Sequence, residues 1–255
     1  MNRVFVLGAY VDAVTQDEAV AGILRLARTR GRHMVVTPNV DHVIRMRRDA
    51  HLREIYRSAA LVLADGMPLV WASRLTRTPL PERVTGADLI APVLAGAERD
   101  GLSVFFLGPM RDTLDIALSR FAVQFPGLRI AGSHSPPFGF EADPLLDAQC
   151  TEALRAANPD IVIACLGAPK QELWIFRKRR EVGFGIALCL GAALDFVAGF
   201  QKRCPPAIGR LGLEWAWRVG NEPRRLWRRY AQCLLLAPVL MWEQVRYARR
   251  HRAKG

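Results

Sequence analysis

Several short motifs that usually reveal a chemistry are missing from this chain of 255 residues. It contains no Gly-x-Gly-x-x-Gly, no Gly-x-x-x-x-Gly-Lys-Ser/Thr and no Gly-x-Ser-x-Gly, so no motif supports a dinucleotide-binding, P-loop or hydrolase assignment. The pair Asp-x-Asp, which often holds a divalent cation, is absent, and the five histidines include no pair at ligand spacing. We therefore expect no metal site and no cofactor, and a bound diphosphate would have to be neutralised by Arg, Lys and helix N-termini.

Disulfide pairing and membrane-spanning segments are not expected either. The five cysteines are an odd number without a Cys-x-x-Cys pair, and Cys165 and Cys189 lie inside apolar runs. These features predict a reducing, cytoplasmic compartment. The first residues contain only a brief apolar run before Asp12, so neither a signal peptide nor a transmembrane anchor is predicted there.

Acidic residues are scarce in the C-terminal part of the chain, which carries most of the net charge of +12. From Lys202 onward there are 13 Lys and Arg but only three acids, whereas the first 201 residues hold 23 basic and 21 acidic residues. Four of the six tryptophans also lie in this last stretch. We therefore expect an α/β core at residues 1–205 and, at residues 206–255, a basic, aromatic, helical appendage that contacts an anionic membrane surface.

Short apolar runs alternate with stretches of helical character along the core. The runs Asp160–Cys165 and Ile186–Leu190 are almost wholly apolar, as in parallel strands that are covered on both faces. Helix-length stretches such as Gln16–Arg28 and Arg111–Phe125 separate such runs. The alternation predicts an α/β fold with a Rossmann-like, layered, mostly parallel sheet flanked by helices.

Polar residues follow two of these runs at the point where each strand is expected to end. Leu166-Gly-Ala-Pro leads into Lys170-Gln-Glu, and Gly191-Ala-Ala leads into Asp195. Ligands of open α/β sheets bind outside the carboxyl ends of the strands, where backbone N–H groups and helix dipoles suit phosphate. These turns predict a nucleotide site, although the same residue types also serve as ordinary helix caps.

Asp65 is the best candidate for a general acid or base. It follows an apolar run, Gly66 beside it permits close approach of a ligand, and a helix is expected to begin just after it. The alternative is that Asp65 is only the N-cap of that helix. Thr37 and Asn39 follow another apolar run, and helix capping is the default interpretation for both.

Arg83 is a candidate for an anion contact. It follows a Pro-rich loop and lies beside another expected helix N-terminus. The alternative is an ion pair with Glu82 or with an acid elsewhere on the surface.

Six segments, in order along the chain, resemble the WecG/TagA/CpsF family of glycosyltransferases. They are Thr37-Pro-Asn39, Ala64-Asp-Gly-Met-Pro-Leu-Val-Trp71, Pro81-Glu-Arg-Val-Thr-Gly86, Gly167-Ala-Pro-Lys-Gln-Glu172, Asp195-Phe-Val-Ala-Gly199 and Gly212-Leu-Glu-Trp215. The resemblance covers nearly the whole chain to Tyr230. This sequence departs from the family pattern at Ala193-Leu194, where Ser-Phe is common, and at Cys204, where Ala is usual, but it keeps the charged and amide positions.

The resemblance implies a membrane-associated, metal-independent, inverting glycosyltransferase. It would transfer a sugar from a UDP-sugar to a saccharide linked to polyprenyl diphosphate, in cell-surface or exopolysaccharide biosynthesis. By the match, Asp65 would be the general base, and Thr37 and Asn39 would line the sugar and acceptor pocket. The nucleotide sugar would be held by the other matched residues, which are Arg83, Gly167, Lys170, Gln171 and Asp195.

The basic tail would supply further cations to the diphosphate. The apolar stretch Cys233–Trp242 is about ten residues long, far below the roughly 20 that span a bilayer, so we expect it to lie on the inner face of the cytoplasmic membrane. The alternative is that the tail packs on the core or in a homo-oligomer interface. The expected diphosphate contacts, on two short helices broken at Pro223, are Arg218, Arg224, Arg225 and Arg228.

Two other classes of protein fit parts of the sequence. A nucleic-acid-binding protein would explain the basic, aromatic tail but not the polar residues at the strand ends, so we expect no nucleic-acid partner. A non-catalytic nucleotide-sugar sensor would keep Arg83, Gln171 and Asp195 but would have no use for Asp65.

Overall fold

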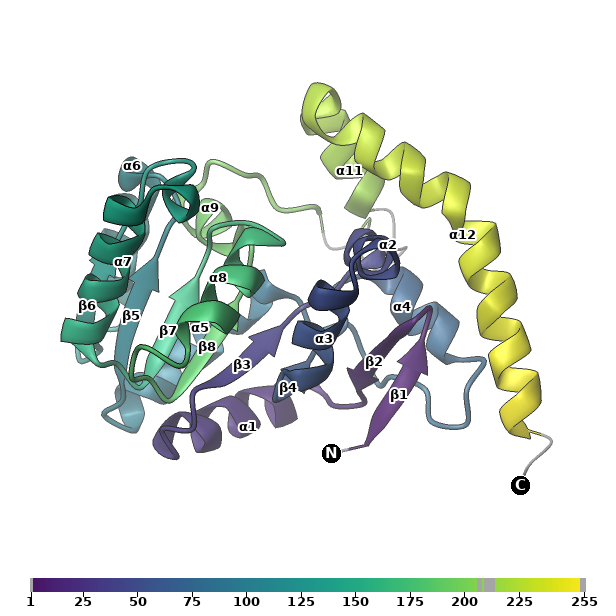
Figure 1. Cartoon of the computed structure of the whole chain (residues 1–255), viewed down its shortest axis with the longest axis horizontal. Helices are drawn as coiled ribbons and strands as arrows, with labels where there is room; N and C mark the ends of the chain where they lie inside the picture. The colour runs from purple at the N-terminus through teal and green to yellow at the C-terminus, as the bar shows by residue number, and fades with distance from the viewer. Residues whose placement is uncertain (1, 206–207, 209–213, 253–255) are drawn as a thin grey trace.

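A parallel sheet forms the centre of the protein in a computed structural model that describes residues 2–205, 208 and 214–252 (Figure 1). Its six strands lie in the order β4-β3-β8-β7-β5-β6, and each neighbouring pair is parallel. The predicted α/β fold with a layered, mostly parallel sheet is therefore confirmed. The strands are β3 (His33–Val36), β4 (Leu61–Val62), β5 (Ser103–Leu107), β6 (Arg129–His134), β7 (Ile161–Ala164) and β8 (Ile186–Cys189).

A separate antiparallel pair precedes this sheet. It consists of β1 (Arg3–Val6) and β2 (Ala9–Asp12). Asp12 ties the pair to the main sheet, because its carboxylate accepts a hydrogen bond from the backbone N–H of Val62 at 2.8 Å and pairs with Arg3 at 3.1 Å.

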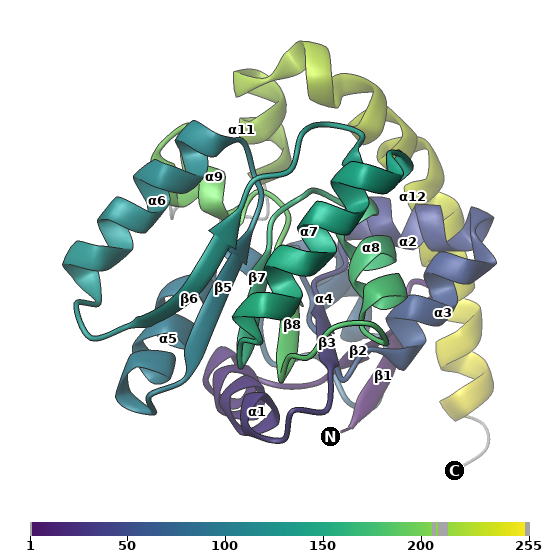
Figure 2. The same ribbon diagram turned by 60° about the vertical axis from the view of Figure 1, so that its left-hand side comes forward.

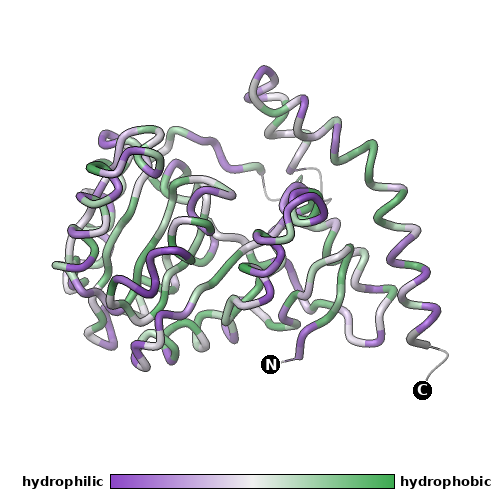
Figure 3. The backbone as a smooth tube through the Cα atoms, in the orientation of Figure 1, coloured by the Kyte–Doolittle hydropathy of each residue, from purple (hydrophilic) through white to green (hydrophobic). Residues whose placement is uncertain are grey.

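Two hydrophobic cores lie on opposite faces of the sheet, because successive side chains of a strand point to opposite sides. In β5, Val104 and Phe106 belong to one core, and Phe105 and Leu107 belong to the other. Helices cover both faces, so the central strands are hydrophobic along their length (Figure 2 and Figure 3). One core contains α1 (Gln16–Arg28), α5 (Gly86–Arg99), α6 (Arg111–Gln124) and α9 (Ala193–Ala198), and the other contains α2 (Val40–Arg48), α3 (Ala50–Ser58), α4 (Met67–Ser73), α7 (Pro144–Ala157) and α8 (Lys170–Lys178).

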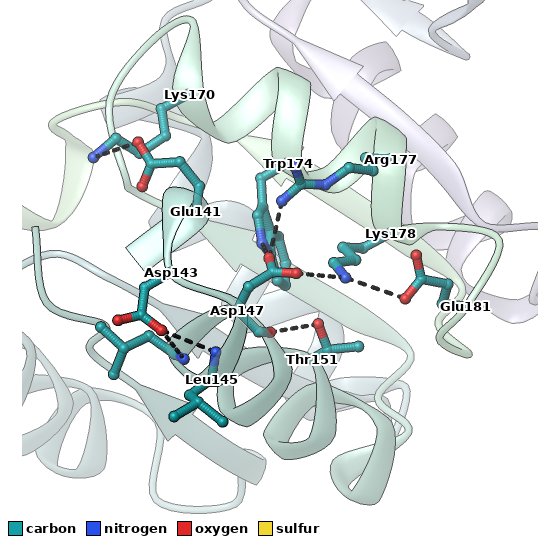
Figure 4. A network of polar contacts seen from close by, with 11 residues as sticks. Glu141, Asp143, Leu145, Asp147, Thr151, Lys170, Trp174, Arg177, Lys178 and Glu181 are labelled. Carbon is teal, nitrogen blue, oxygen red and sulfur yellow. Dashed lines mark hydrogen bonds and ion pairs between the residues drawn. The ribbon is translucent and has the colours of Figure 1, made fainter. Parts of the chain in front are cut away.

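Helix α8 is held against α7 by one partly buried polar network. The carboxylate of Asp147 accepts hydrogen bonds from Trp174 Nε1 at 2.7 Å and Arg177 at 2.9 Å, and it pairs with Lys178 at 2.7 Å (Figure 4). Trp174 itself is buried against Phe140, which lies in the short 3₁₀ helix η1 (Phe140–Ala142). The network therefore holds α8 against α7 from Trp174 to the end of the helix.

The described part of the tail forms two helices, α11 (Glu214–Asn221) and α12 (Pro223–Arg252). The expectation of two short helices is wrong for the second, which has 30 residues and continues through Pro238. A proline inside a helix costs about 3 kcal/mol. Packing offsets this cost, because Cys233 and Leu240 on either side of Pro238 are buried in the core.

Helix α12 also makes polar contacts with the N-terminal part of the chain and runs along the side of the molecule that carries the β1–β2 pair (Figure 1). Buried Gln244 accepts a hydrogen bond from the backbone N–H of Leu7 at 2.8 Å and donates one to the carbonyl of Phe5 at 3.3 Å. Glu243 forms an ion pair with Arg47 of α2. In the part of the chain that the structure describes, no helix combines the length and the apolar character that crossing a bilayer requires.

Candidate active site

A cavity of about 780 Å³ opens at the carboxyl ends of the strands, at the location expected for a ligand in this fold, and we name it the polar cavity after the charged and amide side chains in its wall. Four strands lead into it. Thr37 and Asn39 follow β3, and Asp65 follows β4. The turn at Gly167 follows β7, and the turn at Gly191 follows β8. The structure therefore brings together residues that lie more than 150 positions apart.

A smaller, mainly apolar chamber of about 180 Å³ lies between the start of α4 and the tail. Trp215 of α11 and Tyr230 of α12 belong to its wall. The remaining apolar wall is formed by Val40, Met67, Pro68, Cys233, Leu234 and Ala237. Six residues belong to the walls of both the chamber and the polar cavity and therefore lie where the two spaces meet. They are Asn39, Asp41, Asp65, Met67, Arg83 and Glu214.

Asp65 is half-buried in this shared wall. Its backbone N–H donates a hydrogen bond to the carbonyl of Pro38 at 3.0 Å, which ties the end of β4 to the end of β3. Helix α4 has Gly66 as its N-cap, at a φ of 139° that suits only glycine, and no side chain caps it. The interpretation of Asp65 as an ordinary N-cap is therefore wrong.

Asn39 has the capping role that was its default interpretation, and it also lines both spaces. Its side-chain oxygen accepts hydrogen bonds from the backbone N–H groups of Asp41 at 3.1 Å and His42 at 3.4 Å. The imidazole of His42 in turn accepts from the backbone N–H of Asn39 at 3.0 Å. Thr37 does not cap α2. It is buried, and its hydroxyl donates to the carbonyl of Cys189 at 3.4 Å.

Arg83 is held between two acids in the shared wall. It forms an ion pair with Glu214 of α11, and its guanidinium lies 3.8 Å from Asp88. A second cation, Arg203, pairs with the same Asp88 at 2.8 Å and also lines the polar cavity. The alternative prediction, that Arg83 forms an ion pair with an acid, is therefore confirmed. Its partners are Asp88 and Glu214 and not Glu82. An anionic ligand would meet two arginines here.

Gln171 joins the turns that follow β7 and β8. It is buried, its side-chain N–H donates to Glu172 Oε1 at 2.9 Å, and its oxygen accepts from the backbone N–H of Gly191 at 3.1 Å. Both hydrogen bonds lie in the wall of the polar cavity. Gln171 therefore fixes the shape of the cavity as well as lining it.

Glu172 is a cavity residue that sequence reasoning did not select. Only 1% of its surface is exposed, and burial raises the pKa of its carboxyl group to about 7. Its oxygen Oε2 has no hydrogen-bond partner among the described residues. The signal in the sequence was three long polar side chains in a row after a buried strand, which is more than capping requires.

Lys170 and Asp195 do not line either space. The Lys170 ammonium lies 3.4 Å from the Glu141 carboxylate and 4.4 Å from the centre of the Phe138 ring (Figure 4). Successive residues of an α-helix point about 100° apart, so Lys170, Gln171 and Glu172 cannot all face one cavity. Asp195 is half-buried on α9 next to Phe196, which does line the polar cavity.

Two of the four tail arginines expected at the diphosphate have described side chains, and neither lines the cavity. Arg224 and Arg228 are exposed on α12, outside the walls of both spaces, and Arg228 lies 5.4 Å from the centre of the Trp227 ring. The side chains of Arg218 and Arg225 lie outside the described part of the structure. Other tail residues do reach the site, among them Glu214, Trp215 and Tyr230, and they were missed because only tertiary packing places them there.

Groups of acids, histidines and cysteines suitable for a metal were also sought. Across residues 2–205 and 214–252, no three such side chains come together in a way that could hold a metal ion. The arginines in the wall of the polar cavity are Arg83 and Arg203, and each pairs with an acid there.

Comparison with known proteins identifies relatives of this chain. Residues 4–254 match the model of the glycosyl transferase WecG/TagA/CpsF family. A protein of Bacillus spizizenii is 31% identical over 195 residues, which cover 76% of this chain and 73% of that protein. A protein of Staphylococcus aureus is 26% identical over 243 residues, which cover 94% of this chain and 91% of that protein. Both are named N-acetylglucosaminyldiphosphoundecaprenol N-acetyl-beta-D-mannosaminyltransferase.

Proposed function

Because this chain belongs to the WecG/TagA/CpsF family of glycosyl transferases, we propose that it transfers a sugar from a UDP-sugar to a saccharide linked to polyprenyl diphosphate. The proposed reaction inverts the anomeric centre, needs no metal ion, and serves cell-surface or exopolysaccharide biosynthesis. The observation that carries the proposal is the position of Asp65 where a polar cavity meets an apolar chamber. Two such spaces side by side would bring a water-soluble donor and a lipid-linked acceptor to the same carboxylate.

The donor would occupy the polar cavity. Its diphosphate would lie near Arg83 and Arg203, since guanidinium groups form forked hydrogen bonds to phosphate. Gly167 and Gln171 would contact the nucleotide sugar through the turn after β7. Lys170 and Asp195 can join these contacts only if their side chains move from the positions described above.

The acceptor would approach from the apolar chamber, with its reacting hydroxyl beside Asp65. Thr37 and Asn39 would line the space in which the two sugars meet. The relatives named above act on undecaprenol-linked N-acetylglucosamine, and an apolar wall suits the lipid end of such an acceptor.

Asp65 would act as the general base. Its carboxylate takes the proton of the acceptor hydroxyl while the hydroxyl oxygen forms a bond to the anomeric carbon. The bond between that carbon and the UDP oxygen breaks on the opposite face, and its electron pair stays with the departing diphosphate. Arg83 and Arg203 stabilise the negative charge that develops on the departing diphosphate, which is larger in the transition state than in the bound donor.

The tail would hold the enzyme at the inner face of the membrane. We propose that residues 1–205 carry the chemistry and that residues 206–255 contact the lipid surface and, through Arg218, Arg224, Arg225 and Arg228, its phosphates. The support is that α12 exposes several large apolar side chains among its basic residues, as helices at membrane surfaces do. These side chains are Trp227, Leu234, Leu235, Val239, Met241 and Trp242.

A transfer assay with purified protein tests the proposal. A panel of UDP-sugars is offered together with an acceptor in which N-acetylglucosamine is linked to polyprenyl diphosphate, and the lipid-linked product is measured. Product formation from one UDP-sugar supports the proposal. Hydrolysis of the UDP-sugar without transfer would refute the proposed reaction. Binding of UDP-sugars without any turnover would refute it too and would favour a non-catalytic nucleotide-sugar sensor.

A further inference from the structure

The carboxyl group of Glu172 has no evident task in the fold. It lies in the first turn of α8 and in the wall of the polar cavity, with 1% of its surface exposed. Among the described residues it forms no ion pair, because the cation that acts on it, Arg45, is paired with Asp41 instead. A buried acid without a cation is stable mainly in its neutral form.

The two oxygens of Glu172 have different surroundings. Oε1 accepts a hydrogen bond from Gln171 at 2.9 Å and a long one from the hydroxyl of Tyr56 at 3.4 Å. Oε2 is buried and has no partner among the described residues. Because Oε1 already accepts two hydrogen bonds, the proton of the neutral acid belongs on Oε2, which then is a donor without an acceptor.

Burial favours the neutral form of Glu172, whereas Arg45 and the hydrogen bonds from Gln171 and Tyr56 favour the ionised form. Tyr56 approaches from α3, and the buried Cys189 thiol approaches from β8. Helix α2 contributes Asp41 and Arg45, which pair with each other at 2.9 Å, and His42 lies in the same cavity wall. Burial is the largest influence on Glu172, and it raises the pKa of the carboxyl group to about 7.

We propose that Glu172 is a sugar-binding residue, whose neutral carboxyl group donates a hydrogen bond from Oε2 to an oxygen atom of the donor sugar in the polar cavity. This inference rests on the proposed function. Sugars offer hydroxyl oxygens and, in acetamido sugars, a carbonyl oxygen, and each accepts such a bond. An ionised Glu172 would lose this donor and would place a negative charge beside a diphosphate.

Two substitutions test whether Glu172 donates a hydrogen bond to the sugar or accepts one from it. In Glu172→Gln the side-chain oxygen can still accept from Gln171, and the amide N–H takes the place of the acid O–H. In Glu172→Met the size is similar but the donor is removed. Titration calorimetry at pH 6 and pH 8.5 measures the affinities of both variants and the wild type for UDP and for UDP-N-acetylmannosamine.

At pH 6 we expect Glu172→Gln to bind UDP-N-acetylmannosamine as the wild type does. Glu172→Met should bind it roughly fivefold to tenfold more weakly and should bind UDP normally, since one hydrogen bond to the sugar is lost. Above pH 7 the wild-type affinity for the sugar nucleotide should fall by up to about tenfold per pH unit, whereas that of Glu172→Gln should not.

Neighbouring variants identify the titrating group. Tyr56→Phe removes a hydrogen bond that favours the ionised acid, so the fall in affinity should move to higher pH. His42→Gln is the control, since a histidine in the same wall could also respond to pH. If Glu172 is the group responsible, this variant should still lose affinity for the sugar nucleotide as the pH rises.

Three results would overturn the inference. Glu172→Gln could bind as weakly as Glu172→Met at pH 6, which would make Glu172 an ionised acceptor. Glu172→Met could weaken UDP and the sugar nucleotide equally, which would make its role purely structural. The wild type could bind UDP and yet bind no UDP-sugar more tightly than UDP, which would show that the sugar contact is absent. Wild-type protein that binds neither UDP nor a UDP-sugar would instead refute the proposed donor.

Discussion

Replacing Glu172 by Gln should stabilise the protein above neutral pH and should leave its stability almost unchanged at pH 5. The unfolded chain ionises this carboxyl at its usual pKa of 4.5, whereas the folded protein holds the proton until a pKa of about 7. A raised carboxyl pKa contributes stability that is fully present below the unfolded value and is lost as the pH rises through the folded value. The wild type therefore loses stability between pH 4.5 and 7, and the Gln variant does not.

The size of the effect follows from the shift. Each unit of pKa corresponds to 1.36 kcal/mol, so a shift from 4.5 to about 7 amounts to about 3 kcal/mol as an upper bound at pH 8. Urea unfolding followed by tryptophan fluorescence, at pH 5, 6, 7 and 8, measures the difference in unfolding free energy. Buried Trp174, two residues from Glu172 along α8, reports on this region.

The control variant is Glu152→Gln, which removes an exposed carboxylate that pairs with Arg155 on the surface of α7. Exposed ion pairs contribute about 0–1 kcal/mol, so this difference should be small at every pH. A Glu172→Gln effect that does not change between pH 5 and pH 8 would refute a neutral Glu172 in the folded protein.

Other predictions concern the reaction and the tail. Transfer should persist in excess EDTA, since arginines and helix ends meet the diphosphate charge, and loss of activity that Mg²⁺ or Mn²⁺ restores would show that a metal is needed. Leu235→Glu with Trp242→Glu should lower retention on anionic liposomes but not turnover of a soluble acceptor analogue, because both side chains are exposed on α12 away from both cavities. Arg224→Ala with Arg228→Ala should lower liposome retention more at low than at high salt, and equal turnover of the soluble analogue would assign these two arginines to the membrane rather than to the donor diphosphate.

The layered, parallel sheet could be predicted because the local sequence pattern distinguishes buried strands from helices. A strand buried on both faces has to be apolar at every position, and Ile161–Ala164 and Ile186–Cys189 are. The end of each strand then marked the edge where Asp65, Gly167 and Gln171 meet. Secondary structure alone was enough to predict this gathering, since parallel strands present their carboxyl ends at one edge.

The contributions of the tail were not predictable, because they depend on contacts between distant residues. The ion pair between Arg83 and Glu214 joins positions 131 residues apart. The continuation of α12 through Pro238 depends on burial of Leu240, which no local pattern reveals. The burial of Glu172 without a cation is likewise a property of the packed core. Its residue type alone predicts an exposed side chain.

Transfer by Asp65→Asn tests the central claim most directly. The variant keeps the size of the side chain and removes the base, so it should fold and bind UDP as the wild type does while the rate of sugar transfer to the lipid-linked acceptor falls by roughly 10²-fold or more. Folding and UDP affinity are measured on the same preparation by urea unfolding and calorimetry. Transfer at the wild-type rate by a folded, UDP-binding Asp65→Asn protein would contradict the assignment of Asp65 as the base at the junction of the two spaces.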